Sequence, residues 1–219
     1  MERVGEAFVW PFRDPDWPEK IGVIGLILLI PIVGAINGLG WMLAAIDRLR
    51  AGEERLPPAN FDHLGRGFQL FVVYLVYVLA ILVLAAIVYV PAIILLTAAG
   101  GNSGTGLEAV LGVALSFLTF TVVTIAGLAF TFAGAAIVVA TDRHGIAGGL
   151  NVGQVVAMVR VSPTNTLIAG LMLIAASFVG QIGGVLCLIG IVFTVAYSFA
   201  MQAWVIRGFE AGLAAPAHR

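Results

Sequence analysis

The chain has 219 residues, of which 61% are hydrophobic and only 11% are charged. Soluble domains carry about 25% charged residues, so this composition excludes a soluble enzyme and a disordered chain. The charges are also segregated: none falls in residues 21–46 or 161–206, and Glu108 is the only one in residues 67–140. Each stretch exceeds the ~20 apolar residues that cross a ~30 Å hydrocarbon core. The sequence therefore predicts a polytopic helical membrane protein.

Residues 1–20 combine charged groups with four aromatic side chains, Phe8, Trp10, Phe12 and Trp17. Aromatic and charged residues together favour the boundary between membrane and water. We therefore expect residues 1–20 to form an amphipathic interfacial segment. Asp16-Trp17-Pro18-Glu19 predicts a helix start, because Asp16 can cap free N–H groups and proline is tolerated in a first turn.

The first hydrophobic segment, residues 21–46, is long enough to cross a membrane as a helix. Its middle contains Pro31, Gly34, Gly38 and Gly40, which loosen a helix where unpaired backbone groups are least favourable in lipid. Two interpretations follow from this pattern. The segment either spans the membrane, or forms a re-entrant hairpin whose two ends lie on the same side.

Two further apolar segments are predicted to span in opposite directions. The first covers residues 61–90, ended by Pro91 and the glycine-rich residues 100–106, and the second covers residues 107–140. The polar stretch 141–149 is predicted to be a turn.

The last third of the chain is predicted to hold a short helix and a hairpin. Asn151-Val-Gly-Gln154 resembles a capping box, and valines at helical spacing predict an interfacial helix over residues 152–161. Residues 163–206 would measure ~66 Å as one straight helix, about twice the membrane. They must therefore fold back, and the glycine-rich residues 180–184 are the predicted turn.

The basic residues indicate an orientation. Three lie before residue 21, four in residues 47–66, two in 141–162 and two after 206, and none in 100–106. If residues 21–46 form a hairpin, all eleven face the cytoplasm; if they span, three lie outside. In both cases the C-terminus is cytoplasmic. We expect a single transmembrane helical domain over residues 21–206 and a cytoplasmic tail over residues 207–219.

One series of residues resembles a known family. Its members are Phe12, Asp14-Pro15, Trp17, Lys20, Pro31, Gly40-Trp41, Arg48, Arg50, Gly52, Leu56-Pro57, Asp62 and Gly67. Their order is similar to a prokaryotic membrane-protein family catalogued as domain of unknown function 4013. Trp41 stands where that family is expected to have tyrosine, and Pro58 where an acid or aromatic is expected. The resemblance implies a fold and a prokaryotic membrane location, and it implies no activity.

Four polar residues are candidates for a transport pathway or for midplane contacts: Asn37, Gln181, Gln202 and Glu108. An amide at membrane depth needs a hydrogen-bond partner or water. Glu108 also lies just after the 100–106 loop, where a carboxylate favours the positive end of a helix dipole. We interpret Glu108 primarily as a cap.

Small residues are spaced along three segments. They are Gly34 and Gly38; Thr124, Gly127, Thr131 and Gly134; and Gly180 and Gly184. Helices in lipid associate through such faces, since small side chains let their backbones approach closely. These faces are candidates for helix packing within the chain or for contacts between copies.

No catalytic motif accompanies these features. The acid–histidine pairs Asp62-His63 and Asp142-Arg143-His144 can bind metal in principle, but polar residues are also expected at helix ends. The single cysteine, Cys187, excludes an intramolecular disulfide and a thiolate metal cluster. We expect no enzyme activity, cofactor or metal site.

The expected fold is an all-α integral membrane protein with two to three full transmembrane helices. One or two glycine-broken hairpins and flanking interfacial amphipathic helices complete it. The expected partners are the lipid bilayer and further copies of the chain, with no nucleic acid. The function favoured is a non-enzymatic oligomeric membrane assembly or scaffold; the alternative is a passive channel or small-solute transporter.

Overall fold

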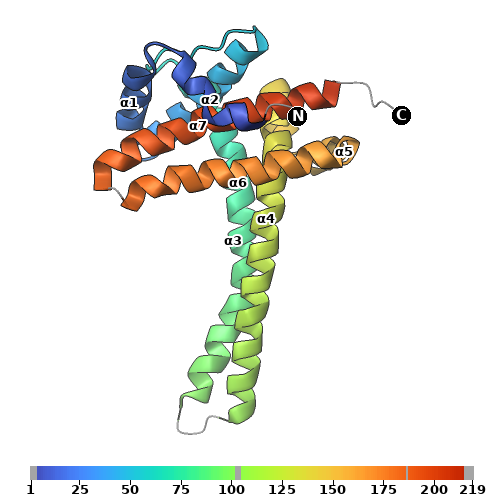
Figure 1. The fold of residues 1–219 in the computed structure, drawn as a ribbon. Helices are drawn as coiled ribbons and strands as arrows, with labels where there is room; N and C mark the ends of the chain where they lie inside the picture. The colour runs from blue at the N-terminus through green and yellow to red at the C-terminus, as the bar shows by residue number, and fades with distance from the viewer. Residues whose placement is uncertain (1–3, 102–104, 186, 215–219) are drawn as a thin grey trace. The chain divides into compact units, whose positions relative to one another are not determined.

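The computed structural model describes residues 4–101, 105–185 and 187–214, and all regular structure in these residues is helical (Figure 1). The chain forms two compact units: unit 1 contains residues 1–73 and 131–219, and unit 2 contains residues 74–130. Among the described residues, three helical stretches are long and apolar enough to cross a membrane: Leu64–Ala99, Gly106–Leu150 and Pro163–Gly183. The predicted all-α membrane fold is confirmed.

The N-terminal segment consists of two 3-10 helices, η1 (Val4–Phe8) and η2 (Trp10–Arg13), followed by α1 (Trp17–Leu28). The predicted helix start is confirmed, but its predicted cap is wrong. Asp16 makes no side-chain cap bond. Instead the carboxylate of Asp14 accepts a hydrogen bond from the Asp16 N–H at 3.0 Å.

Residues 21–46 do not form one helix. α1 ends at Leu28, and α2 (Val33–Arg50) begins after a turn in which Ile32 has a φ of +64°. Gly34 lies so close to α1 that a Cβ at this position would overlap the carbonyl oxygen of Ile27. The break predicted from proline and glycine is therefore present, and glycine is required there because the two helices touch.

α3 (Leu64–Ala99) is longer than predicted, because it continues through Pro91 for another eight residues. The prediction that Pro91 ends the helix is wrong. A proline inside a helix removes one N–H donor, whereas ending a helix leaves up to four carbonyls without partners. In a strongly apolar segment, continuing the helix leaves fewer unpaired groups.

α4 (Gly106–Leu150) also exceeds its predicted length, so the turn predicted over residues 141–149 is wrong in extent. The helix is interrupted at a single residue, Gly145, whose φ of 66° and ψ of −159° are not helical. Glycine adopts this conformation without a steric penalty, so one residue redirects the chain.

The last part of the chain contains α5 (Val152–Val161), α6 (Pro163–Val185) and α7 (Cys187–Ala214). The α5 prediction is confirmed with its cap, since the Asn151 side chain accepts from the Gln154 N–H at 3.0 Å. The turn predicted at 180–184 is wrong, because α6 includes these residues. Gly183 instead allows α6 to approach α7, where a Cβ would overlap the Thr194 hydroxyl.

The core of unit 1 is built around α7, which packs along α6 and against α1 and α2 (Figure 1). Trp10 and Phe209 are among its fully buried side chains, and the Trp10 indole donates to the Ala200 carbonyl at 3.1 Å. In unit 2, α3 and α4 pair as a helical hairpin. Phe130 lies against Tyr74 and Tyr77, with ring centroids 5.4 and 5.6 Å apart.

Candidate functional site

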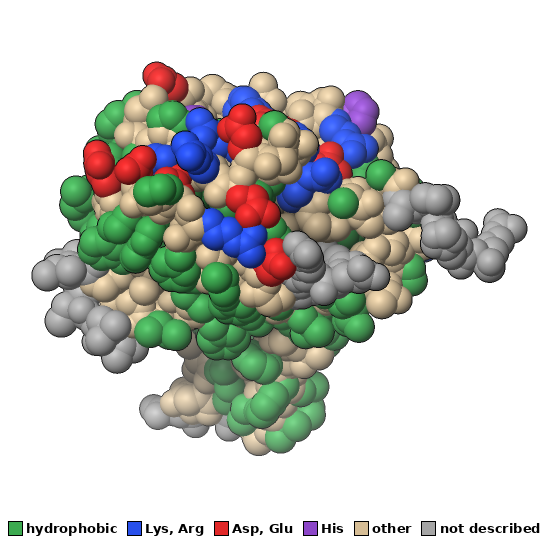
Figure 2. Space-filling view, turned by 45° about the horizontal axis from the view of Figure 1, so that its top comes forward, with side chains coloured by type: hydrophobic (Ala, Val, Ile, Leu, Met, Phe, Trp, Pro, Cys, Tyr) green, Lys and Arg blue, Asp and Glu red, His purple; other side chains and the backbone are tan. Residues whose placement is uncertain are grey.

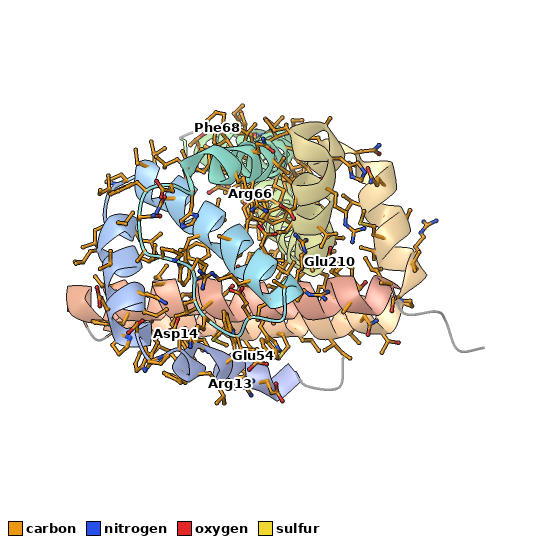
Figure 3. The ribbon with its side chains drawn as sticks, turned by 90° about the horizontal axis from the view of Figure 1, so that it is seen from above. Arg13, Asp14, Glu54, Arg66, Phe68 and Glu210 are labelled. Carbon is orange, nitrogen blue, oxygen red and sulfur yellow. The ribbon has the colours of Figure 1, made fainter. Side chains whose placement is uncertain are left out.

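Seven charged side chains of unit 1 form a cluster that joins four helices. We call it the arginine–carboxylate cluster; its members are Asp47, Arg50, Arg66, Asp142, Arg143, Arg207 and Glu210. They come from the end of α2, the start of α3, the last third of α4 and the end of α7. Figure 2 shows charged side chains of both signs gathered on one face of unit 1, and Figure 3 labels Arg66 and Glu210 within it.

Arg50 is the centre of this cluster. Its Nε and Nη2 donate to the two carboxylate oxygens of Glu210 at 2.8 and 3.1 Å, which is a bidentate pair. Its Nη1 also donates to Asp142 at 2.7 Å and to Asp47 at 2.9 Å. A planar guanidinium presents five donors in fixed directions, which suits it to several carboxylates at once. One side chain therefore connects α2, α4 and α7.

Three further arginines belong to the cluster, and one of them, Arg207, lies 3.9 Å from the Glu210 carboxylate. Arg66 donates to Asp142 at 2.6 Å and also bonds Asp47, and Arg143 donates to Glu210 at 2.8 Å. Burial raises the pKa of Glu210, but hydrogen bonds from Arg50 and Arg143 lower it by more, so this pKa lies below its ordinary value. The carboxylate is thus ionised near neutral pH. Because arginine does not deprotonate in proteins, these pairs stay charged wherever the carboxylates are ionised, and they join the four helices.

A second polar contact, which we call the Asp14 joint, connects the start of α1 to the loop after α2. The Asp14 carboxylate is buried and accepts from the Leu56 N–H at 2.8 Å and from Lys20 Nζ at 2.7 Å. Lys20 also donates to the Leu56 carbonyl at 3.2 Å, and Arg13 pairs with Glu54 beside it (Figure 3). Burial raises the pKa of Asp14, whereas Lys20 and the two backbone donors lower it by more, so the net shift is downward.

Unit 2 contains a shallow groove of about 450 Å³ between α3 and α4. Four small residues line it, Ala85, Ala86, Ser116 and Thr119. The other lining residues are Leu82, Tyr89, Phe120 and Val123. The Ser116 and Thr119 hydroxyls donate to the carbonyls of Gly112 and Leu115 on their own helix, each at 2.9 Å. These hydroxyls are satisfied locally, so the groove presents an apolar surface.

Asn37 is fully buried in unit 1, where its Nδ2 donates to the Asn60 carbonyl at 2.9 Å. Its Oδ1 is buried and has no hydrogen-bond partner among the described residues. Since an unpaired buried acceptor is unfavourable, a bound water is the simplest group to satisfy it.

The other three polar candidates have different surroundings from one another. Gln181 is exposed on α6, and Gln202 donates to the Ser198 hydroxyl one turn earlier on α7, at 3.1 Å. Glu108 forms a capping box with Thr105, since its carboxylate accepts from the Thr105 N–H at 2.8 Å. The interpretation of Glu108 as a cap is confirmed; a transport role for these residues stays a prediction.

Several of the predicted small-residue positions are used for packing within unit 1. A Cβ at Gly38 would meet Leu28 and Phe199, one at Gly180 would meet Ser198, and one at Gly134 would touch Leu173 at 3.4 Å. The surroundings of Gly184 lie outside the described part of the chain. On α4, Thr131 is half-buried and Thr124 is exposed, and a Cβ at Gly127 would have no described atom within 4 Å. A contact between copies at these positions stays a prediction.

The acid–histidine pairs are not joined into a site. Asp142 bonds arginines, His144 lies 3.3 Å from the Gln154 amide, and His63 lies 3.1 Å from the Pro58 carbonyl. Within the described residues, no three histidine, cysteine, aspartate or glutamate side chains come together in a way that could hold a metal ion.

Sequence reasoning missed the arginine–carboxylate cluster, although one signal was present. Ten of the eleven basic residues are arginines, and Arg50, Asp142 and Glu210 each lie at the polar end of a different apolar segment. Arginine is favoured where one cation pairs with several carboxylates. Long-range packing decides which helix ends meet, so the pairing of these arginines with these carboxylates could not be predicted from the sequence.

The chain was compared with known proteins. No curated protein and no solved structure matched it. A family model described as "Protein of unknown function (DUF4013)" matches residues 23–206, which include all of α2 to α6, parts of α1 and α7 and most of the arginine–carboxylate cluster. The match covers well over half of the chain, and it agrees with the resemblance noted from the N-terminal residues. The chain therefore belongs to the DUF4013 family.

Proposed function

We propose that the protein acts without catalysis, as an oligomeric scaffold embedded in the cytoplasmic membrane with its C-terminus in the cytoplasm. The observation that carries this proposal is the groove on the α3–α4 hairpin, with Ala85, Ala86, Ser116 and Thr119 in its lining. Helices in lipid gain little from apolar burial and associate where small residues allow close packing. The groove therefore suits a helix of a second copy.

The exposure of α3 supports the same proposal. In the most apolar 18-residue stretch of α3, only 6% of the residues are buried inside the chain. Lipid or other copies of the chain must therefore cover the remaining residues. A channel or transporter would need polar groups free to face a pathway. The hydroxyls in the groove instead bond their own helix, which favours assembly over transport.

The distribution of charge supports the orientation. The basic residues lie before residue 21, in residues 47–66 and 141–162 and after residue 206, and the 100–106 loop has none. Arginine and lysine are retained on the cytoplasmic side during insertion. This places the arginine–carboxylate cluster and the C-terminus in the cytoplasm in our proposal.

The test is the mass of the protein complex, measured in lipid nanodiscs by native mass spectrometry. The wild type is expected to form a defined multimer. Ala86→Phe fills the groove and is expected to reduce the multimer to monomers. Ala80→Phe is the matched control, since Ala80 is exposed on the same helix and does not line the groove; it is expected to keep the wild-type mass.

Two results would contradict the proposal. A monodisperse wild-type monomer would remove assembly altogether, and an unchanged multimer in Ala86→Phe would remove the groove as its interface. Ion flux through reconstituted vesicles that is abolished by Asn37→Leu would favour a channel instead.

A further inference from the structure

Unit 1 exposes an apolar edge where α1 turns into α2. The residues of this edge are Val23, Leu26, Leu29, Ile30, Ile32 and Val33. Leu26 is 59% exposed and Ile32 is 63% exposed, although both are large aliphatic side chains. The opposite face of α1 is buried, with Ile21, Ile24 and Gly25 packed inside unit 1.

The side chains of this edge are unsuited to contact with water. A helix on the surface of a soluble domain keeps polar residues on its outer face. Between Lys20 and Asn37, however, the chain has no polar side chain at all. α1 is thus apolar on its exposed face as well as on its buried face, which is the pattern of a helix covered by an apolar medium.

The backbone of the turn is also adapted to an apolar medium. Ile32 has a φ of +64° and a ψ of −60°, which form a γ-turn closed by a 2.7 Å hydrogen bond from the Val33 N–H to the Pro31 carbonyl. The turn's other internal bonds run from Leu29 to Leu26, from Ile30 to Ile27 and from Gly34 to Ile30. Four N–H groups of the turn are thus satisfied internally, as a turn in lipid favours, whereas the Ile32 N–H donates to no backbone carbonyl among the described residues.

The start of α1 is held against the loop that follows α2. The Asp14 joint brings the start of α1 into contact with Leu56, which follows α2. From the turn, α1 reaches back ~18 Å, and α2 reaches ~21 Å to its first charged residue, Asp47. Both lengths are below the ~30 Å hydrocarbon core. Each of the two helices is therefore too short to cross the membrane and has the length to reach about one leaflet.

The apolar edge continues onto the neighbouring hairpin. A Cβ at Gly22 would touch Phe193 of α7 at 3.6 Å, and Phe193 is itself 43% exposed. On α6, Phe178 and Ile182 are exposed near the same end of that hairpin. The exposed amide of Gln181 lies between them in sequence and is uncharged.

From these observations we infer that the apolar edge is a membrane-insertion surface, and that its partner is the hydrocarbon of one bilayer leaflet. Charged groups lie beyond the ends of the helix pair, while the aliphatic side chains of the edge and the turn enter the lipid. This inference depends on the protein lying in a membrane and does not depend on the proposed oligomer.

The experiment is depth-dependent quenching of a fluorophore in reconstituted vesicles of phosphatidylcholine and phosphatidylglycerol. In a full-length Cys187→Ala background, Ile32→Cys carries an environment-sensitive dye. Gly65→Cys is the control, because it is exposed in the same unit and a Cβ there meets nothing within 4 Å. Ile30→Cys is a second test position, in case relief of the positive φ at residue 32 alters the turn.

The dyes at residues 32 and 30 are expected to emit at shorter wavelength than the dye at residue 65. Lipids brominated on their acyl chains should quench them several-fold more strongly, and aqueous iodide several-fold less. Iodide quenching equal to that at residue 65 would overturn the inference. Protection from both quenchers would overturn it too, since protein and not lipid would then cover the edge. Neither result depends on the mass measured for the multimer.

Discussion

Arg50 shows how one residue can join three helices. Its guanidinium bonds Glu210, Asp142 and Asp47, which come from three different helices. The Glu210 carboxylate is mostly buried, so removing its partner would leave a charge with poor access to water. Arg48, only two residues earlier, pairs with Glu53 at 3.8 Å near the surface.

This contrast gives a matched pair of substitutions. Arg50→Gln is expected to lower the free energy of unfolding by roughly 1–3 kcal/mol, the range for lost hydrogen bonds to charged groups. Arg48→Gln is expected to change it by less than about 1 kcal/mol, since exposed pairs contribute little. Thermal unfolding in detergent, followed by circular dichroism, measures both. Equal stabilities of the two variants would show that the cluster does not hold the helices.

Helix caps, which depend on neighbouring residues, could be predicted from the sequence. Hydrogen bonds between residues far apart in the chain could not. The Asn151 cap joins residues three positions apart, so spacing predicted it. Glu108 was predicted as a cap from its place just after the 100–106 loop, whereas its partner Thr105 was not predicted. Asn37 was recognised as a polar group at a glycine break, but its partner, the Asn60 carbonyl, is set by how the following loop folds back. Asp142 was noticed beside a histidine, whereas its arginine partners lie 76 and 92 residues away.

At the scale of elements, glycine determines how closely the helices of unit 1 approach. Gly25 on α1 lies against the backbone of α7, where a Cβ would overlap the Val192 carbonyl oxygen. Gly22, one turn earlier on the same helix, has ordinary space, with Phe193 at 3.6 Å from an added Cβ. A backbone neighbour cannot move aside as a flexible side chain can.

Substitution of these two glycines by alanine separates packing from helix propensity. Gly25→Ala is expected to destabilise the protein by about 1–3 kcal/mol through overpacking. Gly22→Ala is expected to be neutral or to stabilise by up to ~1 kcal/mol, because alanine favours the helix. The measurement is the melting temperature of each purified variant. A Gly25→Ala protein that melts with the wild type would mean that α1 does not pack on α7 in this way.

Helix existence was predictable, while several helix ends were not. Apolar runs predicted α3, α4 and the α6–α7 pair, and α5 was predicted with its exact bounds. Pro91 and the glycines at 180–184 were read as ends because both residue types break helices in water. Inside apolar segments the backbone keeps its helical hydrogen bonds, so α3 continues through Pro91. Gly183 does not end α6 and instead allows close contact between α6 and α7.

At the scale of the whole molecule, charge and apolar surface are separated along the chain. The charged residues of the arginine–carboxylate cluster and the Asp14 joint belong to unit 1, and unit 2 is a hairpin in which Glu108 is the only charged residue. The central claim of our account is that α3 and α4 cross the membrane while residues 21–46 enter and leave on the cytoplasmic side.

The most direct test of this claim is cysteine accessibility in intact cells, measured with a membrane-impermeant maleimide in a Cys187→Ala background. Gly5→Cys, Gly65→Cys and Gly106→Cys are matched, because a Cβ at each position would have no described atom within 4 Å. We predict that Gly106→Cys is labelled from outside, and that Gly5→Cys and Gly65→Cys are labelled only after lysis. Labelling of Gly5→Cys in intact cells would contradict the account, because residues 21–46 would then have to span the membrane.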